Sequence, residues 1–465
     1  MKFVNRKKEL KQLEEYYNLS KKGLMTVAMA GLRRVGKTTL IKEFVKDKKA
    51  IYFFVYESKT SLALLDEFTK ELRARKIITE IEKIDSWMLF FDIIFKRCQD
   101  HIIIFDEFQN FYSIDRSVFS IMQRFCDDNQ STPINIIILG SLISLFRKIF
   151  EDKKQALYGR IAAKIKLESF SLKDSFFVMH ILGIDNIEER IQLYSLFGGF
   201  PKYYAAIEQF ELTKKSPLEI IEYLFVQENA PLENEVTEIL KQEFGRRSSL
   251  YYSILEAIAN GKTKLSEIAS TIHMKESSIT RHLSELEEKF NLIKSMRPIG
   301  SKKNTRYSLT HPLILFWFKF IYNKFSEYKL KDTKELMKNI SKDFNSFVGK
   351  RFEDVSREFL IAKFPLDSIG NWWGNRRIND AREEIEIDLV ATEANTILFV
   401  ECKWKENINA EEIVRLCEEK SRFVEWNKKD RNESFVVFAK SFEKKIGEFN
   451  SKKVYCFDLK DIENE

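Results

Sequence analysis

Mostly apolar runs, each ended by polar residues, recur through the first third of the chain. They lie at residues 24–30, 51–56, 101–105 and 134–139. Strands that are buried on both faces of a parallel sheet show such unbroken runs, whereas half-exposed strands alternate. Because a segment with helical spacing at 40–46 follows the first run, we predict an α/β fold with a parallel sheet in this part of the chain.

The periodicity of the middle part is helical. Apolar residues recur at helical spacing in three short segments, 251–260, 265–270 and 275–290. A short apolar pair and the strand-like segment 306–309 follow them. Three helices and a β-ribbon in this order predict an α+β winged helix-turn-helix. The aromatic-rich segment 312–318 predicts a buried helix that docks this module to its neighbours.

A second change of period marks the last third. Residues 384–388 alternate strictly between polar and apolar side chains, and 397–404 is a second strand-like run. The helical segment 347–362 precedes both, and the charged stretch 323–342 predicts a connecting helix. We therefore expect a further α/β domain at this end.

The composition is that of a large folded protein. Hydrophobic residues make up 44% of the 465 positions, with only 7 Pro and 15 Gly, which suffices for about three cores of ordinary size. The longest apolar stretches are shorter than the roughly 20 residues that cross a bilayer, and the N-terminus lacks the apolar core of a signal peptide. We expect a cytoplasmic protein without a membrane anchor. The five scattered cysteines include no CxxC pair, so we expect reduced thiols and no structural zinc.

The polar segment after the first apolar run has the pattern G-x-x-x-x-G-K-[ST]. Its glycines let backbone N–H groups surround phosphates at the N-terminus of the following helix. Lys37 can then reach the β- and γ-phosphates, and the Thr38 hydroxyl can ligate Mg²⁺. The sequence therefore predicts a Walker A site for ATP, whose contact residues are Gly31, Arg33, Arg34, Val35, Gly36, Lys37, Thr38 and Thr39.

Two carboxylates follow the third apolar run, at the strand edge where ligands of α/β sheets collect. Asp106 is the expected Mg²⁺ partner, and Glu107 is placed to act as general base toward the attacking water. The fourth run ends before Ser141, which is either a sensor of the γ-phosphate or simply the end of a strand. Arg160 is a candidate arginine finger, a phosphate contact within the chain, or an ordinary exposed arginine.

Several segments of the first 205 residues or so resemble a known family. Residues 3–10, F-V-N-R-K-K-E-L, are similar to the F-x-x-R-x-x-E-L motif of STAND and AAA+-type ATPases, with Asn5 where Gly is usual. The loop G-L-R-R-V-G-K-T-T-L, the D-E-F-Q at 106–109, the Y-G-R at 158–160 and the G-G-F-P-K-Y at 198–203 are similar to the archaeal ATPase family. The resemblance implies an ASCE-type parallel sheet with an extra strand between Walker A and Walker B, which residues 51–56 could supply. It also implies a helical lid after about residue 171.

The positive charge of the chain is concentrated in the middle part. The whole chain has a net charge of +7, and residues 236–330 alone hold 16 basic and 9 acidic residues, so the remainder is neutral. A polyanion is therefore expected to bind here. Polar residues at the start of the third helix would face a DNA major groove and basic residues of the wing would contact phosphates. The candidates are Ser277, Ser278, Thr280, Arg281, Lys294, Arg297, Lys302, Lys303 and Arg306.

A protein-binding role for the winged helix is the alternative. Glu285, Glu287 and Glu288 lie on the third helix and would repel DNA. DNA affinity that is absent or independent of salt would favour this alternative.

The last third contains the pattern D…(D/E)xK on its two predicted strands. Glu401 and Lys403 project from the same face of one strand, and Asp388 lies on the neighbouring one. Asp388 and Glu401 can hold a hard divalent cation, Lys403 can steer or deprotonate water, and Glu353 on the preceding helix would complete the acidic cluster. These residues resemble the PD-(D/E)xK nuclease fold, in the domain of unknown function that follows the archaeal ATPases. The alternative is a retained scaffold with a structural ion network.

We therefore expect five segments: a P-loop NTPase core at 1–170, a helical lid at 171–235, a winged helix with its docking helix at 236–330, a linker at 331–344 and a restriction-endonuclease-like domain at 345–465. The expected function is ATP hydrolysis with Mg²⁺, coupled to DNA binding and to metal-dependent phosphodiester cleavage. A homo-oligomer or a protein partner is also compatible with the motifs. The alternatives are a nucleotide-dependent switch that cleaves nothing and a signalling scaffold whose winged helix binds protein.

Overall fold

A computed structural model describes residues 3–141, 143–244, 249–301, 303–329, 333–378 and 381–464. The chain divides into two compact units. Unit 1 comprises Met1–Ser169 with the short segments Phe200–Lys202 and Glu288–Phe290, and unit 2 comprises Phe170–Gly199, Tyr203–Glu287 and Asn291–Glu465. The division of the sequence into five segments stays a prediction.

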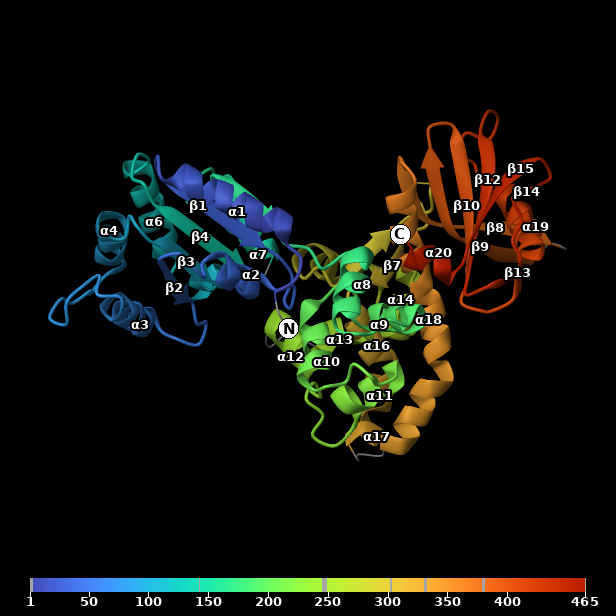
Figure 1. Cartoon of the computed structure of the whole chain (residues 1–465), viewed down its shortest axis with the longest axis horizontal. Coiled ribbons are helices and arrows are strands. Elements are labelled where there is room, and N and C mark those ends of the chain that lie inside the picture. Colours follow the sequence, from blue (N-terminus) through green and yellow to red (C-terminus); the bar gives the residue numbers. More distant parts are fainter. Residues whose placement is uncertain are drawn as a thin grey trace. The chain divides into compact units, whose positions relative to one another are not determined.

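Unit 1 is built on a five-stranded sheet in the order β2-β3-β4-β1-β5, in which every pairing is parallel (Figure 1). The strands are β1 (Met25–Ala30), β2 (Ala50–Phe54), β3 (Ile102–Asp106), β4 (Asn135–Gly140) and β5 (Ala163–Lys166). The first four coincide with the apolar runs of the sequence. The predicted parallel α/β sheet is therefore confirmed.

One detail of the predicted sheet is wrong. The strand that lies between the Walker A and Walker B strands in space is β4, which pairs with β1 on one side and β3 on the other. The segment 51–56 supplies β2, which lies between β1 and β3 only in sequence and forms the edge of the sheet beside β3. The sequence places a strand here, but its order in the sheet depends on which crossover the intervening helices make.

Helices cover both faces of this sheet. They are α1 (Lys7–Ser20), α2 (Lys37–Phe44), α3 (Ser61–Ala74), α4 (Trp87–Arg97), α5 (Phe111–Ile114), α6 (Ser117–Asp128) and α7 (Ile143–Glu151). Side chains of β2, β3 and β4 on one face join α3, α4 and α6 in a single apolar cluster. Coverage of both faces explains why the strands are apolar at every position rather than alternating.

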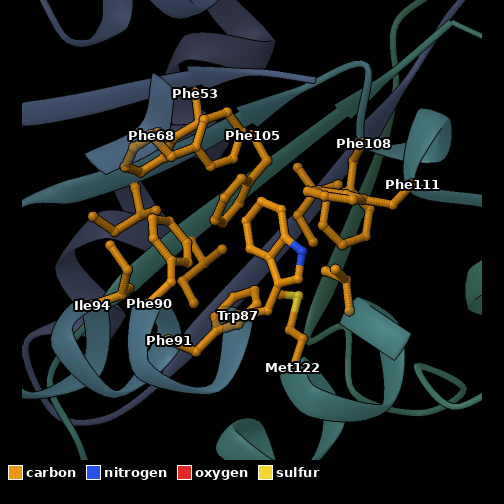
Figure 2. Packing of buried hydrophobic residues seen from close by; sticks show 14 of the residues in the cluster. Phe53, Phe68, Trp87, Phe90, Phe91, Ile94, Phe105, Phe108, Phe111 and Met122 are labelled. Atoms are coloured by element: carbon orange, nitrogen blue, oxygen red, sulfur yellow. The ribbon is translucent and has the colours of Figure 1, made fainter. Parts of the chain in front are cut away.

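A dense set of aromatic rings holds the end of β3 in place (Figure 2). Phe105, the residue before Asp106, lies 5.4 Å from the ring of Phe53 between centroids. Phe108, which follows Glu107, lies 5.4 Å from Phe111, and both are fully buried. The two acidic residues at the tip of β3 therefore stand between anchored phenylalanines, which restricts their backbone.

Unit 2 begins with helices and a small two-stranded sheet. The helices are α8 (Leu172–Ile181), α9 (Ile187–Phe197), α10 (Pro201–Gln209), α11 (Pro217–Ile221), α12 (Glu235–Phe244), α13 (Ser249–Ala259), α14 (Leu265–Thr271), α15 (Glu276–Ser284), α16 (Pro312–Phe316) and α17 (Phe325–Lys329). The antiparallel strands β6 (Ile293–Met296) and β7 (Arg306–Leu309) follow α15. The order of three helices and a β-ribbon agrees with the pattern of the sequence.

The C-terminal part of unit 2 is a six-stranded mixed sheet in the order β14-β15-β12-β10-β9-β8. Its strands are β8 (Ser368–Ile378), β9 (Ala381–Glu393), β10 (Thr396–Lys403), β12 (Asn432–Ala439), β14 (Glu448–Phe449) and β15 (Lys452–Phe457). The two strands predicted from the sequence are β9 and β10, which pair in antiparallel fashion. A second small sheet joins β11 (Ile408–Asn409) to β13 (Phe442–Lys444).

Helices cover both faces of the mixed sheet as well. The long α18 (Thr333–Lys363), orange in Figure 1, packs Phe352 and Phe359 against Phe438 of β12. On the other face, Val414 of α19 (Ala410–Ser421) joins Phe399 in an apolar cluster. The chain ends with α20 (Leu459–Glu463). Among the described residues, no helix combines the length and the apolar character needed to cross a membrane.

His311, at the start of α16, is enclosed in the core of unit 2. Burial, together with the positive charge of Arg351 on α18, lowers the pKa of His311 to about 3. As the pH falls below about 6.5, the unfolded chain therefore takes up a proton that the folded chain does not, and the free energy of unfolding falls. Between pH 7 and pH 5 we expect His311 to cost about 2 kcal/mol of stability.

Urea titrations of the wild type and of His311→Gln at several pH values measure this effect. The variant should lose less stability than the wild type on acidification. His273→Gln, at an exposed position of the same unit, controls for the loss of an imidazole elsewhere. Equal acid sensitivity of wild type and His311→Gln would contradict the prediction.

Candidate functional site

The loop between β1 and α2 lies close to neighbouring backbone and adopts a conformation suited to glycine. Gly36 has a φ of 91°, and a Cβ on Gly31 would lie 2.5 Å from the Leu167 carbonyl oxygen. Gly36 precedes the first residue of α2 and offers no side-chain cap to its N–H groups. The first turn of α2 is therefore suited to an anionic ligand such as a phosphate.

The ammonium group of Lys37 is held by the same loop. Its Nζ donates to the carbonyl oxygens of Gly31 at 2.8 Å and Leu32 at 3.0 Å. Arg6, from the N-terminal F-x-x-R-x-x-E-L segment, donates to the carbonyl oxygens of Val35 at 3.2 Å and Glu168 at 2.6 Å. Arg6 thus braces the loop from outside, a role that the sequence motif alone did not indicate.

Asp106 faces the first turn of α2. Its Oδ2 accepts from the Thr38 hydroxyl at 3.0 Å and from the Tyr52 hydroxyl, and its Oδ1 accepts from the Glu107 backbone N–H at 2.9 Å. Burial raises the pKa of the Asp106 carboxyl above its usual range, and the hydrogen bonds from Tyr52 and Thr38 oppose that shift. The two residues predicted to hold Mg²⁺, Thr38 and Asp106, are therefore in direct contact.

Glu107 is placed beside them by an unusual backbone conformation. Its φ of 54° is left-handed, which is uncommon for a residue with a side chain. The Ser141 hydroxyl donates to its Oε1, the Gln109 amide donates to its Oε2, and the Arg33 guanidinium lies 3.8 Å from Oε1. The structure thus brings Ser141 at the end of β4 to Glu107 at the end of β3, because these strands are neighbours.

Two residues of this site were missed from the sequence. Tyr52 points from β2 to Asp106, and Gln109 comes two residues after Glu107. The sequence could not indicate that Tyr52 lies beside β3, because it does not give the order of the strands in the sheet. Gln109 belongs to the D-E-F-Q segment, whose similarity to a family motif was the available signal.

Arg160 does not lie with these residues. Its guanidinium makes two 3.0 Å contacts with Asp127, and its carbonyl oxygen accepts from Thr26 near the start of β1. The P-loop follows the other end of β1, so a phosphate contact within the chain is wrong for Arg160. The sequence motif did not show at which end of the sheet Arg160 lies. The pairing of the strands shows that it lies at the end away from the P-loop.

The second set of predicted residues meets in the mixed sheet. Lys403 Nζ lies 2.6 Å from Glu401 Oε2 on the same strand and 3.4 Å from Asp388 Oδ2 on β9. Asp388 Oδ2 also accepts from the Cys402 backbone N–H at 2.8 Å, and Lys420 of α19 lies 2.7 Å from Glu401 Oε1. The two carboxylates therefore share a small volume with two ammonium groups.

Glu353 joins this set from α18. Asn371 on β8 donates from one amide nitrogen to Glu353 Oε2 at 3.1 Å and to the Asp388 carbonyl oxygen at 2.7 Å. Burial, and then the charge of Asp388, raises the pKa of Glu353 to about 8. Burial, and then the charge of Glu401, raises the pKa of Asp388. Asn371 and Lys420 were missed because neither belongs to the D…ExK pattern.

The predicted nucleic-acid residues fall into two groups. On α15, Ile279 and Leu283 are buried, which leaves the polar residues Ser277, Ser278, Thr280 and Arg281 exposed. Arg297 and Lys303 are exposed in the loop between β6 and β7, and Lys302 lies outside the described residues.

Lys294 and Arg306 are half-buried, and their contact with phosphates stays a prediction. Arg306 forms ion pairs with Glu384 and with Glu386, the latter at 2.5 Å, and lies 4.5 Å above the ring of Trp373. Burial lowers the pKa of Lys294, which faces Asp354. The ribbon packs against the mixed sheet, a tertiary contact that no local pattern of the sequence contains.

The site in unit 1 defines the class of protein. A loop of the Walker A type, a strand that ends in two acids and an intervening strand between them in a parallel sheet are the features of a P-loop ATPase. Residues 3–207 match the family described as an ATPase domain predominantly from Archaea, and residues 317–415 match a family described as archaea bacterial proteins of unknown function.

A relative shows the family over the full chain. An uncharacterized protein of Methanocaldococcus jannaschii is 30% identical over 479 aligned positions, and the alignment covers 99% of this chain and 100% of the relative. The chain therefore belongs to the family of archaeal-type ATPases that carry this second domain. An uncharacterized ATP-binding protein of the same organism is 53% identical over 47 residues, 10% of this chain and 76% of that protein.

A solved structure shows the same fold. The Walker-type ATPase of Pyrococcus abyssi is similar over 68% of this chain and 96% of its own, with a TM-score of 0.53 and 21% identity. This likeness supports the fold, while the activity is argued from the sites.

Proposed function

We propose that the chain binds ATP with Mg²⁺ at the P-loop and hydrolyses it. The 3.0 Å contact between Thr38 Oγ1 and Asp106 Oδ2 carries this proposal, because it joins a hydroxyl and a carboxylate where the two motifs predict one cation. Both oxygens suit Mg²⁺, which is held by few protein ligands together with substrate phosphates. When bound, the cation would neutralise negative charge on the phosphate oxygens.

The protein residues divide the remaining work. Lys37 exchanges its two carbonyl partners for the β- and γ-phosphates, and the first turn of α2 binds phosphate oxygens through backbone N–H groups. Glu107 accepts a proton from the attacking water. Ser141, which donates to Glu107, holds that carboxylate in position and senses whether a γ-phosphate is present.

Lys37→Ala tests nucleotide binding. The loss of a charged hydrogen-bond donor, worth about 1.5–3 kcal/mol, should weaken ATP binding about 10- to 100-fold. Isothermal titration with a non-hydrolysable ATP analogue and Mg²⁺ measures it. Lys42→Ala, on the exposed face of the same helix, is the matched control. Unchanged affinity in Lys37→Ala would contradict the proposed site.

A second candidate function is metal-dependent cleavage of phosphodiesters in unit 2. It rests on the position of Lys403 between the carboxylates of Asp388 and Glu401. Within the described ranges, no three His, Cys, Asp or Glu side chains form a ready-made metal site. Two carboxylates nevertheless fit Mg²⁺, which usually keeps several waters and completes its shell with substrate phosphate.

The roles of these residues follow from their contacts. Asp388 and Glu401 would hold the cation, which would stabilise charge on the phosphate when bound. Against the opposing effect of burial, the charges of Glu401 and Asp388 raise the pKa of Lys403, which is therefore held protonated and orients the attacking water. Asn371 fixes Glu353 relative to the β9 backbone. Supercoiled plasmid and circular single-stranded DNA, each incubated with the full chain and Mg²⁺, test the activity, because a nicked or linear product forms only when a phosphodiester is cut.

The two activities would be linked through DNA and through assembly. The exposed polar face of α15 is suited to DNA contact, and a nucleotide-dependent change of conformation would license the second site. Arg160 could act as an arginine finger only toward a neighbouring copy, which makes a homo-oligomer part of this proposal. The alternative is a nucleotide-dependent switch with a silent second site and a protein-binding winged helix, in which Asp388→Ala leaves the biology unchanged.

A further inference from the structure

Three adjoining cavities form a groove within unit 2, between the β6–β7 ribbon and the elements α18, β8 and β9. The central cavity has a volume of 230 Å³, and its neighbours have volumes of 410 and 310 Å³. The central cavity shares Arg306 and Trp373 with one neighbour and Lys350 and Arg351 with the other. We call these three cavities together the wing groove.

The acidic site lies in the middle of the wing groove. Glu353, Asp388 and Asn371 line the central cavity, opposite Lys294 of β6 and Arg306 of β7. Glu401 and Lys403 are not among its lining residues, so the wing groove meets the proposed cleavage site on the side of Glu353 and Asp388.

Basic residues line the whole length of the wing groove, and the carboxylates of Asp354, Glu384 and Glu386 line it too and hold several of them in ion pairs. Lys319 and Lys350 line one end, and Lys264 lines the other. Lys350 is exposed and has no carboxylate partner among the residues that the structure describes. Burial and then the positive charge of Lys350 lower the pKa of Lys319. Asp343 opposes that shift, and the two positive charges favour an anion at this end of the groove.

An aromatic ring also belongs to the wing groove. Trp373 lines both the central cavity and the 410 Å³ cavity, and its Nε1 donates to the Asn304 carbonyl oxygen at 3.1 Å, which fixes the plane of the ring. Trp373 is only 6% exposed and the Arg306 guanidinium lies 4.5 Å above its ring, so a base can stack on that face only after Arg306 moves aside. Cationic tracks with aromatic stacking partners are the means by which proteins bind single-stranded nucleic acid.

We propose that the wing groove binds a single strand of nucleic acid and presents its phosphodiester to Glu353 and Asp388. Protein encloses the groove on two sides, and its three cavities have volumes of 230 to 410 Å³. A duplex needs an open surface that exposes both backbones, so it does not enter. The inference deepens the proposed cleavage activity, on which it rests for the chemistry that follows binding.

The ion pairs of Arg306 set the conditions for entry. Phosphates must compete with Glu384 and Glu386 for this guanidinium, so binding should depend strongly on salt. With three or four phosphate contacts, the logarithm of the association constant should fall with the logarithm of the salt concentration with a slope of about −2 to −3.

Fluorescence anisotropy with the full chain in EDTA tests the binding without any cleavage. The probes are a labelled oligothymidylate, an oligouridylate of the same length and a duplex. Each unlabelled nucleic acid is then added as a competitor of the labelled strand. We expect the single strands to compete at least tenfold more strongly than the duplex. DNA and RNA strands that compete equally would show that the groove contacts backbone and base faces rather than the sugar.

Three variants locate the binding. Lys350→Glu should weaken single-strand binding about tenfold, and Trp373→Ala should weaken it about 5- to 100-fold through lost stacking, with Trp373→Phe restoring most of the affinity. Lys342→Glu, an exposed lysine of the same helix α18 outside the groove, is the matched control and should bind as the wild type does. Lys350→Glu keeps the test valid if Trp373→Ala fails to fold, because Lys350 is exposed.

The outcomes separate binding from cleavage. Weakened binding in Lys350→Glu supports the groove even where neither the plasmid nor the circular single strand is cut, a result that would remove only the proposed cleavage. Binding that is equal in Lys350→Glu and Lys342→Glu overturns the groove, and so does a duplex that displaces the single strand at equal concentration.

Discussion

Replacing Glu107 by glutamine is expected to lower kcat for ATP hydrolysis about 100- to 10,000-fold, the range that a positioned general base contributes. The amide keeps the shape of the side chain and can still meet Ser141 and Gln109, but it cannot accept a proton at neutral pH. Nucleotide affinity should stay within a few-fold of wild type, since Lys37 and α2 bind the phosphates. Steady-state phosphate release together with nucleotide titration measures both quantities.

The variants of the site should divide into two classes. Lys37→Ala weakens binding, whereas Glu107→Gln slows the chemical step after binding. Glu80→Gln, at an exposed position of unit 1, is the control and should do neither. A Glu107→Gln protein that hydrolyses ATP at the wild-type rate would show that another group takes the proton and would leave Glu107 with a structural role.

The framework of the nucleotide site was predictable because strands buried on both faces need unbroken apolar runs. Those runs placed β1, β3 and β4 to within a residue or two, and polar residues follow directly at their ends. The contact of Thr38 with Asp106 then follows from the parallel arrangement alone. Tyr52 was not predictable, because its contact depends on β2 lying at the edge beside β3.

The second site shows the same limit more clearly. Strand alternation identified Asp388, Glu401 and Lys403 as neighbours, and the structure has them in contact. The pattern contained nothing about Asn371, which is distant in sequence and acts through two hydrogen bonds. Arg306 ends a basic loop that contains no carboxylate, and the sequence therefore did not indicate a protein partner for it. In the structure its guanidinium pairs with two carboxylates of the mixed sheet, which lie far from it in sequence.

Asp388→Asn is expected to reduce metal-dependent phosphodiester cleavage at least about 100-fold, because a neutral amide replaces one of two anionic ligands. The free energy of unfolding of the same variant should stay the same or increase. The raised pKa of Asp388 in the folded chain means that its carboxylate costs free energy as the pH rises above the unfolded value, and this cost is fully present once the pH exceeds the folded value. At neutral pH the variant should therefore unfold at the same or a higher urea concentration.

Loss of cleavage without loss of stability distinguishes a functional carboxylate from a structural one. A residue of a structural ion network would lose stability on neutralisation, because Lys403 would keep only Glu401 as a partner. A metal ligand would lose cleavage while the fold holds. Glu425→Gln, an exposed acid of the same sheet domain, is the control for both measurements. Cleavage at the wild-type rate in Asp388→Asn would assign the DNA cleavage to another site. Lowered stability of the variant, together with DNA that the wild type leaves uncut, would favour the silent scaffold.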